Sequence, residues 1–242
     1  MAPRRTTPLF ATIILVVVAL SSAGHASPWR DFEDALYTAY GDYRVALFQT
    51  NQKNKAATEA ALSNFEAKWS ALAVKHRTTP PPQYGDDPKW AETLATVDNI
   101  LAQAKFETAA GDLPKAHETL EAIRDQLGHL RARNGIITFS DRMNAYHAKM
   151  EHMLQPSYLG FGAAGLLTVR EDTAVLAHLA QDAVRNPPKG VAENPEFKTL
   201  ASAFVDSIQV VKLSLQKNEA PTVEAALKAL KKPYSQLFLK FG

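Results

Sequence analysis

Apolar side chains recur every three or four positions along most of this chain, which is the spacing that one face of an α-helix requires. In the first half, this pattern predicts helices over residues 29–50, 56–76, 88–110 and 113–133. The strict alternation of a half-buried strand is essentially missing. We therefore predict an all-α protein.

Proline and glycine mark where these helices begin and end. Three consecutive prolines in residues 78–85 cannot continue a helix, so this segment is a linker. Asp87-Pro88 predicts the next start, with Asp87 as N-cap and Pro88 in the first turn. Gly111 ends that helix and Gly135 closes the fourth, because glycine readily adopts the left-handed conformation that follows a helix.

The second half of the chain repeats landmarks of the first half about 107 residues later. The matching positions are Asp87-Pro88 with Asn194-Pro195, Pro114 with Pro221, and residues 118–123 with residues 225–230. Repetition at a fixed distance indicates that one structural unit occurs twice. Each copy has the length of an up-down-up-down bundle. We predict a tandem pair of four-helix bundles, at residues 28–135 and 139–242, the second ending in a helix over 220–242.

The first 26 residues have the three parts of a secretory signal peptide. Arg4 and Arg5 come first, residues 9–20 are almost wholly apolar, and residues 21–26 are small and polar. A membrane-spanning helix needs about 20 apolar residues, so this run is short for an anchor, although an uncleaved anchor stays the alternative. We predict cleavage after Ala26 and a periplasmic location, with no membrane association of the mature protein.

Cysteine is absent from the chain. An exported protein of this size without disulfides fits a bacterial periplasm better than a eukaryotic secretory route. The lack of thiols excludes thiolate metal sites, covalently attached c-type haem and cysteine catalysis. Residues 27–242 carry 25 basic and 25 acidic side chains, because two of the 27 Lys and Arg lie in the signal segment. Since a neutral chain does not attract nucleic acid or an anionic membrane, we expect neither as a partner, and a periplasmic protein partner stays open.

All three methionines other than the initiator fall within eleven residues of one predicted helix, together with two histidines. Met143, His147 and Met150 lie on one face of that helix, with His152 and Met153 on the flanking faces. Thioether and imidazole ligands suit copper or haem iron better than calcium or magnesium. The segment therefore predicts a metal site, and a copper ion is the cofactor that we expect. The alternative is that the methionines fill the core and His147 makes an internal hydrogen bond.

A second candidate set lies on the predicted helix at 113–133. His117, Glu121, Asp125 and His129 follow one another at four-residue intervals, which places them along one helix face. Imidazole and carboxylate together suit a harder ion such as zinc or iron. The alternative is a solvated helix face held by ion pairs between successive turns.

Common catalytic signatures are missing, since the chain has no HExxH, GxSxG or P-loop motif. We therefore expect a protein that is not an enzyme. The leading hypothesis is an exported helical-bundle protein that binds copper through the Met/His helix. The alternative from another class is an interaction or scaffold module without a ligand.

The linker around Pro81-Pro82 and the turn at residues 111–116 resemble the second half of the cytochrome b562-type four-helix bundle. The resemblance covers the third and fourth predicted helices and, more faintly, their equivalents in the second half. It implies a third hypothesis, an electron carrier whose non-covalent haem b is held by a Met near the start of helix one and a His near the end of helix four. Here the first helix has no Met, and His129 lies near the end of the fourth. The second copy begins with Met143, and its last helix has no His.

Overall fold

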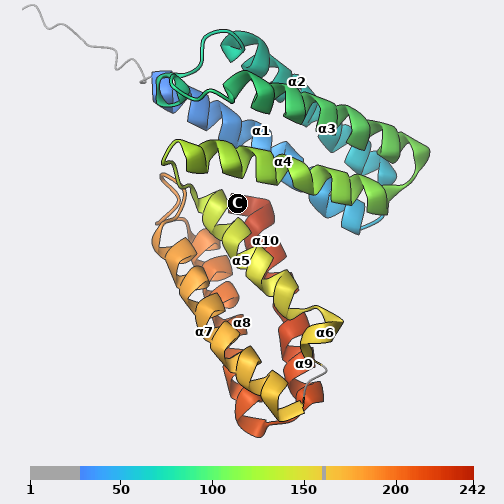
Figure 1. Ribbon diagram of the computed structural model, residues 1–242, viewed down its shortest axis with the longest axis vertical. Helices are drawn as coiled ribbons and strands as arrows, with labels where there is room; N and C mark the ends of the chain where they lie inside the picture. Colours follow the sequence, from blue (N-terminus) through green and yellow to red (C-terminus); the bar gives the residue numbers. More distant parts are fainter. Residues whose placement is uncertain (1–27, 160–161) are drawn as a thin grey trace, which may run out of the picture.

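The computed structural model describes residues 28–159 and 162–242 (Figure 1). Within these ranges the chain forms α-helices and one short 3-10 helix, with no β-strand, so the all-α prediction is confirmed. None of the described helices is both long and apolar enough to span a bilayer. The predicted signal segment, residues 1–26, lies outside the described ranges.

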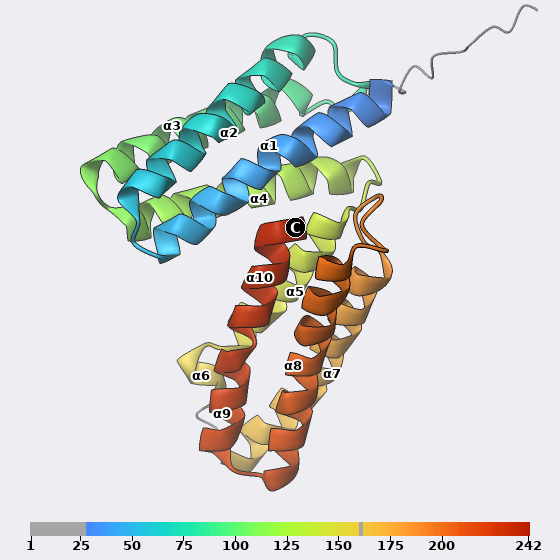
Figure 2. The same cartoon turned by 180° about the vertical axis from the view of Figure 1, so that it is seen from behind.

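The first four α-helices pack beside one another as one group (Figures 1 and 2). They are α1 (Pro28–Asn51), α2 (Lys55–His76), α3 (Trp90–Ala110) and α4 (Leu113–Arg133), with the 3-10 helix η1 (Pro82–Tyr84) between α2 and α3. The predicted helices are present because the apolar face that each spacing defines finds neighbours to bury it. In α2, for example, Phe65, Trp69 and Leu72 all lie in the core.

The start of α3 differs from the prediction. Its N-cap is Lys89, and no side chain caps it. Asp87 instead accepts hydrogen bonds from the amide of Lys89 (2.8 Å), from Asn134 Nδ2 (2.7 Å) and from Arg133 Nη2 (3.1 Å). Asp87 therefore ties the start of α3 to the end of α4.

The remaining helices form a second group. They are α5 (Phe139–Met153), α6 (Pro156–Leu159), α7 (Gly162–Arg185), α8 (Pro195–Lys217), α9 (Ala220–Ala229) and α10 (Lys231–Phe241). The last predicted helix, 220–242, is divided at Leu230 into α9 and α10. Pro233 accounts for the break, because it has no N–H and its ring clashes with the carbonyl four residues earlier. That the two groups are sequence repeats, with limits at 28–135 and 139–242, stays a prediction.

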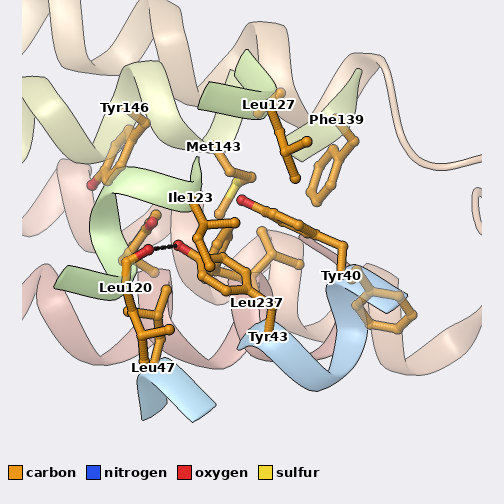
Figure 3. Close-up of a cluster of buried hydrophobic side chains, with 14 of the residues drawn as sticks. Tyr40, Tyr43, Leu47, Leu120, Ile123, Leu127, Phe139, Met143, Tyr146 and Leu237 are labelled. Carbon is orange, nitrogen blue, oxygen red and sulfur yellow. Dashed lines mark hydrogen bonds between the residues drawn. The ribbon is translucent and has the colours of Figure 1, made fainter. Parts of the chain in front are cut away.

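One end of the second group meets the side of the first (Figures 1 and 2). The start of α5 and the end of α10 lie against α1 and α4. Buried side chains from these four helices form one core, shown in Figure 3, with Tyr40, Tyr43 and Leu47 from α1, Leu120, Ile123 and Leu127 from α4, Phe139, Met143 and Tyr146 from α5, and Leu237 from α10. Within it, the Tyr43 hydroxyl donates to the Leu120 carbonyl at 2.9 Å. The two groups therefore share a core.

Polar contacts attach the last turn of α10 to α1. The Tyr37 hydroxyl donates to the Phe241 carbonyl, and Arg44 Nε donates to the Leu239 carbonyl, each at 3.3 Å. The Arg44 guanidinium also lies over the rings of Tyr37 and Tyr40, 5.3 and 5.8 Å from their centroids. A cation is favourable at this position, because the carbonyl end of a helix is the negative end of its dipole.

A buried ion pair fixes α4 relative to α5. Arg131 of α4 is 4% exposed, and its Nε and Nη2 donate to both carboxylate oxygens of Asp141 of α5 at 2.6 to 3.0 Å. Asp141 also accepts from the Thr138 amide at 2.8 Å, which completes a capping box at the start of α5. The short connection between the two groups is therefore held where it enters the second group.

Candidate functional site

A groove of about 670 Å³ lies between the two groups. Its walls come from α1, α4, α5 and α10, so it is built by both groups together. His117 of α4 and His147 of α5 both line it, and we call it the histidine groove. Leu47, Phe48 and Phe238 supply apolar parts of the wall.

His147 has 16% of its side chain exposed at the groove. Its ring stacks on Tyr234 of α10, with the centroids 5.1 Å apart, and its Nε2 lies 3.7 Å from Oε1 of Glu151. Burial, followed by the positive charges of Arg124 and Lys231, lowers the pKa of His147 to about 3. The imidazole is therefore unprotonated at neutral pH, and one of its nitrogens can accept a hydrogen bond or bind a metal.

His117 faces the same groove from α4. Its Nδ1 lies 2.8 Å from Oγ1 of Thr50, and the Thr50 hydroxyl donates to the Leu47 carbonyl at 2.7 Å. Because the hydroxyl has only one hydrogen and gives it to the carbonyl, neutral His117 must donate to Thr50 through Nδ1. Its Nε2, 3.7 Å from Oε1 of Glu121, then carries the free lone pair.

The predicted Met/His set is divided between the core and the groove. Met143 is fully buried among the core side chains of Figure 3 and does not line the groove. Met150 is also buried but borders the groove. Met153 is buried elsewhere, and His152 is exposed, edge-on to the Tyr158 ring. The five side chains of the predicted Met/His set therefore do not come together at one place, and only His147 and Met150 line the groove.

The second predicted set is divided in the same way. His117, Glu121 and Asp125 line the histidine groove, whereas His129 is exposed further along α4. Two candidate sites that are separate in the sequence therefore contribute to one groove. Within the described ranges, no group of three or more His, Asp or Glu side chains is arranged to hold a metal ion.

Two further residues line the groove, and neither was predicted as a ligand. Arg124 belongs to the ion-paired helix face that was the alternative for the second set, and Tyr234 has no counterpart in the sequence predictions. Arg124 has 11% of its side chain exposed and donates from Nη2 to Oε1 of Glu121 at 3.0 Å. Tyr234 is 5% exposed, and its hydroxyl has no hydrogen-bond partner in the described part of the chain. The spacing of Tyr234, Leu237 and Phe238 predicts a buried face of α10, but an unsatisfied hydroxyl results from packing and leaves no mark in the sequence.

A second groove, of about 620 Å³, lies nearer the start of α1. Trp29, Tyr37 and Ile137 are partly exposed on its wall. None of the predicted site residues lines it, and its wall mixes apolar with charged side chains such as Glu33 and Arg142.

Residues 160–165 match the GxGxxG pattern of dinucleotide-binding loops. That pattern indicates a dinucleotide site only between a β-strand and a helix. Helix α6 precedes it here, and residues 28–159 and 162–242 contain no strand. The match therefore lacks the context that such a site needs.

No protein-family model, curated protein or solved structure matches this chain. The resemblance to the cytochrome b562 type stays a prediction. The two haem ligands that it suggests lie in different surroundings, since Met143 is in the shared core and His129 is exposed on α4.

Proposed function

We propose that this protein binds a small organic ligand in the histidine groove without transforming it. The volume of the groove, about 670 Å³, falls within the range of about 300–1,000 Å³ that is typical of small-molecule sites. Phe48 and Phe238 can cover an apolar ring or chain, while polar side chains such as His117 and His147 can orient it. This groove, with its mixed lining, is the observation that supports the proposal.

Binding fits the chemistry of the groove better than catalysis does. With a pKa of about 3, the His147 imidazole is too weak a base to remove protons efficiently near neutral pH. The carboxylates of Glu121 and Glu151 each have a cation at 3.0 Å, Arg124 and Lys231 respectively. These acids are therefore occupied in ion pairs along the wall.

A groove-filling substitution tests the proposal. Ala148 is exposed and lines the histidine groove, so Ala148→Trp places a large ring there without disturbing the core. Ala60→Trp, at an exposed position of α2, is the matched control. Benzoate, benzamide and benzylamine serve as probes, because they share one ring and differ in charge.

We expect at least one of these probes to bind the wild type and Ala60→Trp in ligand-observed NMR at about millimolar concentration, as befits so small a ligand. The same probe should no longer bind Ala148→Trp. Equal binding to all three proteins, or no binding by any probe, would contradict the proposal.

A copper ion is the second candidate ligand. His117, His147 and Met150 line the same groove, and both histidines can present an unprotonated ring nitrogen. Two imidazoles and a thioether form a soft ligand set that suits Cu(I). The other predicted ligands, Met143 and Met153, are buried away from it.

Elemental analysis with a visible spectrum tests this candidate, on protein purified from a periplasm supplied with copper, iron and haem. Near-stoichiometric copper that is lost in Met150→Leu supports it. A Soret band would instead support the haem hypothesis. Protein free of metal, haem and probe binding would contradict every ligand proposal and favour an interaction module.

The proposed site of action is the periplasm, and the support for it is residues 1–26 alone. Protein recovered from the periplasmic fraction should have the intact mass of residues 27–242. A full-length mass in the membrane fraction would favour an uncleaved anchor, and recovery from the cytoplasm alone would contradict export.

A further inference from the structure

Arg124 lies at the histidine groove with most of its hydrogen-bonding capacity unused. A guanidinium carries five N–H donors. Among the described residues, the hydrogen-bond partner of Arg124 is Oε1 of Glu121, which receives Nη2 at 3.0 Å. The side chain of Glu121 is itself 36% exposed. A planar guanidinium with free N–H groups matches the two oxygens of a carboxylate.

Tyr234 provides a second donor beside Arg124. Its ring is held between His147 and Phe238, with centroids 5.1 and 5.6 Å away. Its hydroxyl is buried and has no hydrogen-bond partner in residues 28–159 and 162–242. Burial raises the pKa of Tyr234, and the nearby charge of Arg124 only partly opposes this. The hydroxyl therefore stays protonated. Because its oxygen is enclosed, it donates to a ligand oxygen only when the ligand displaces the side chains that cover it.

The charged side chains that line the groove are balanced, with Arg44, Arg124 and Lys231 positive and Glu121, Asp125 and Glu151 negative. Glu121 has Arg124 beside it, and Asp125 is exposed at the rim. At His147, the positive charges of Arg124 and Lys231 act in the same direction as burial and oppose protonation. Burial is the largest cause of this low pKa, so charge alone does not decide between an anion and a cation. The unused N–H donors of Arg124 and the hydroxyl of Tyr234 favour an anion, because an anion can accept hydrogen bonds and an ammonium group cannot.

We propose that the histidine groove recognises an acid group of its ligand, a carboxylate or a comparable oxyanion, which accepts hydrogen bonds from Arg124 and Tyr234. This inference rests on the proposed function, ligand binding in the same groove. The apolar part of the ligand lies along Phe48 and Phe238. The ligand class is therefore small organic acids with an apolar body.

The three probes test the inference directly, and benzoate and benzamide are isosteric. Benzoate should bind the wild type at least about tenfold more tightly than benzamide, as one charge-assisted pair of hydrogen bonds provides, and benzylamine should bind most weakly. Arg124→Met should abolish the preference for benzoate. Arg77→Met is the matched control, because it removes an exposed arginine that pairs with Asp98 and lies outside the groove. It should keep the preference.

Tyr234→Phe is a second variant, which removes one oxygen that has no partner among the described residues and so leaves the fold intact. It should weaken benzoate several-fold and leave benzamide unchanged, with helicity by circular dichroism as the check on folding. If benzamide or benzylamine binds in the groove as tightly as benzoate, or if Arg124→Met keeps the preference, the inference is overturned while ligand binding stands. If no probe binds, the proposed function and the inference fall together.

Discussion

Arg124 and Arg131 lie seven residues apart on the same face of α4, yet they differ in burial and in hydrogen-bond partners. Arg131 lies where the chain passes into α5, and both of its nitrogens in contact with Asp141 make short hydrogen bonds. Arg124 lies two turns away, and in the described ranges it has one hydrogen bond and a groove beside it. Figure 1 shows α4 and α5 diverging with distance from their connection.

The difference shows how one sequence feature leads to two outcomes. Near the connection, the helices are close enough for Asp141 of α5 to accept three hydrogen bonds from Arg131 of α4. Further along, the divergence leaves room for solvent or a ligand, and the arginine keeps free donors. A buried arginine held by both oxygens of a carboxylate is typical of a structural cation, whereas a partly buried arginine with one hydrogen bond among the described residues is typical of a binding site.

The largest loss of stability should come from replacing Arg131, the arginine that holds α4 to α5. Arg131→Met leaves Asp141, whose side chain is 17% exposed, without its cation, so we expect the free energy of unfolding to fall by about 3 kcal/mol in urea denaturation. Arg124→Met removes an ion pair with a half-exposed glutamate and should cost less than about 1 kcal/mol.

The double variant Arg131→Met/Asp141→Asn is the control for the unpaired charge. It should recover part of the loss, because the amide oxygen can still accept from the Thr138 amide without carrying a buried charge. Similar losses for Arg124→Met and Arg131→Met would remove the distinction between the two positions.

The free energy of unfolding should depend on pH through His147 at the groove and not through Arg131 at the connection between α4 and α5. The pKa of His147 is about 3 in the folded protein and about 6.5 in an unfolded chain. Below pH 6.5 the unfolded state therefore binds a proton that the folded state does not, and stability falls until about pH 3. Between pH 7 and pH 4.5 this should cost about 2–3 kcal/mol.

His147→Gln is the matched variant for measuring this pH dependence, since it keeps a polar side chain that does not titrate. The difference in unfolding free energy between wild type and His147→Gln should change by this amount across the range, while other groups cancel. Parallel pH profiles would show that His147 is protonated as readily in the folded state as in the unfolded one. Arg131 should contribute nothing to the slope, because it stays charged throughout.

The smallest effect is expected from removing the hydroxyl of a buried tyrosine. Tyr43 has a hydrogen-bond partner, and Tyr234 at the groove has none in the described ranges. Tyr43→Phe removes a buried hydrogen bond to the Leu120 carbonyl and should cost about 0.5–1.5 kcal/mol. Tyr234→Phe removes a buried hydroxyl without a partner in the described chain and should be neutral or stabilising. A loss for Tyr234→Phe as large as that for Tyr43→Phe would mean that the Tyr234 hydroxyl is already satisfied.

The helices could be predicted because their signal is local. Asn194 caps α8 by accepting from the amides of Glu196 and Phe197, as a residue before Pro195 should. Asp87 stands before a proline in the same way and accepts from the amide of Lys89, but it also bonds across to Arg133 and Asn134 at the end of α4. The division of the last helix at Leu230 was also readable, since Pro233 stands inside the predicted segment.

The candidate site could be predicted only in parts. Spacing placed His117 on one helix face and His147 on another, but their meeting at one groove depends on how the two groups pack. Met143 and Met150 share a helix face and are equally buried, yet only Met150 borders the groove. Arg44 also lines the groove. It could have been predicted as a candidate from the sequence, because a charged side chain one turn after Tyr40 interrupts an apolar helix face.

The bonds from Tyr37 to Phe241 and from Arg44 to Leu239 join residues 204 and 195 positions apart. Helices α1 to α4 can assemble from contacts between neighbours in the sequence, but the face of α1 that carries Tyr37 and Arg44 stays uncovered until α10 has been made. During synthesis and folding this face is therefore open to association with other chains. Because these two bonds join the first helix to the last, α1 to α4 assemble before α10 covers them. The face of α1 with Tyr37 and Arg44 is exposed during that interval.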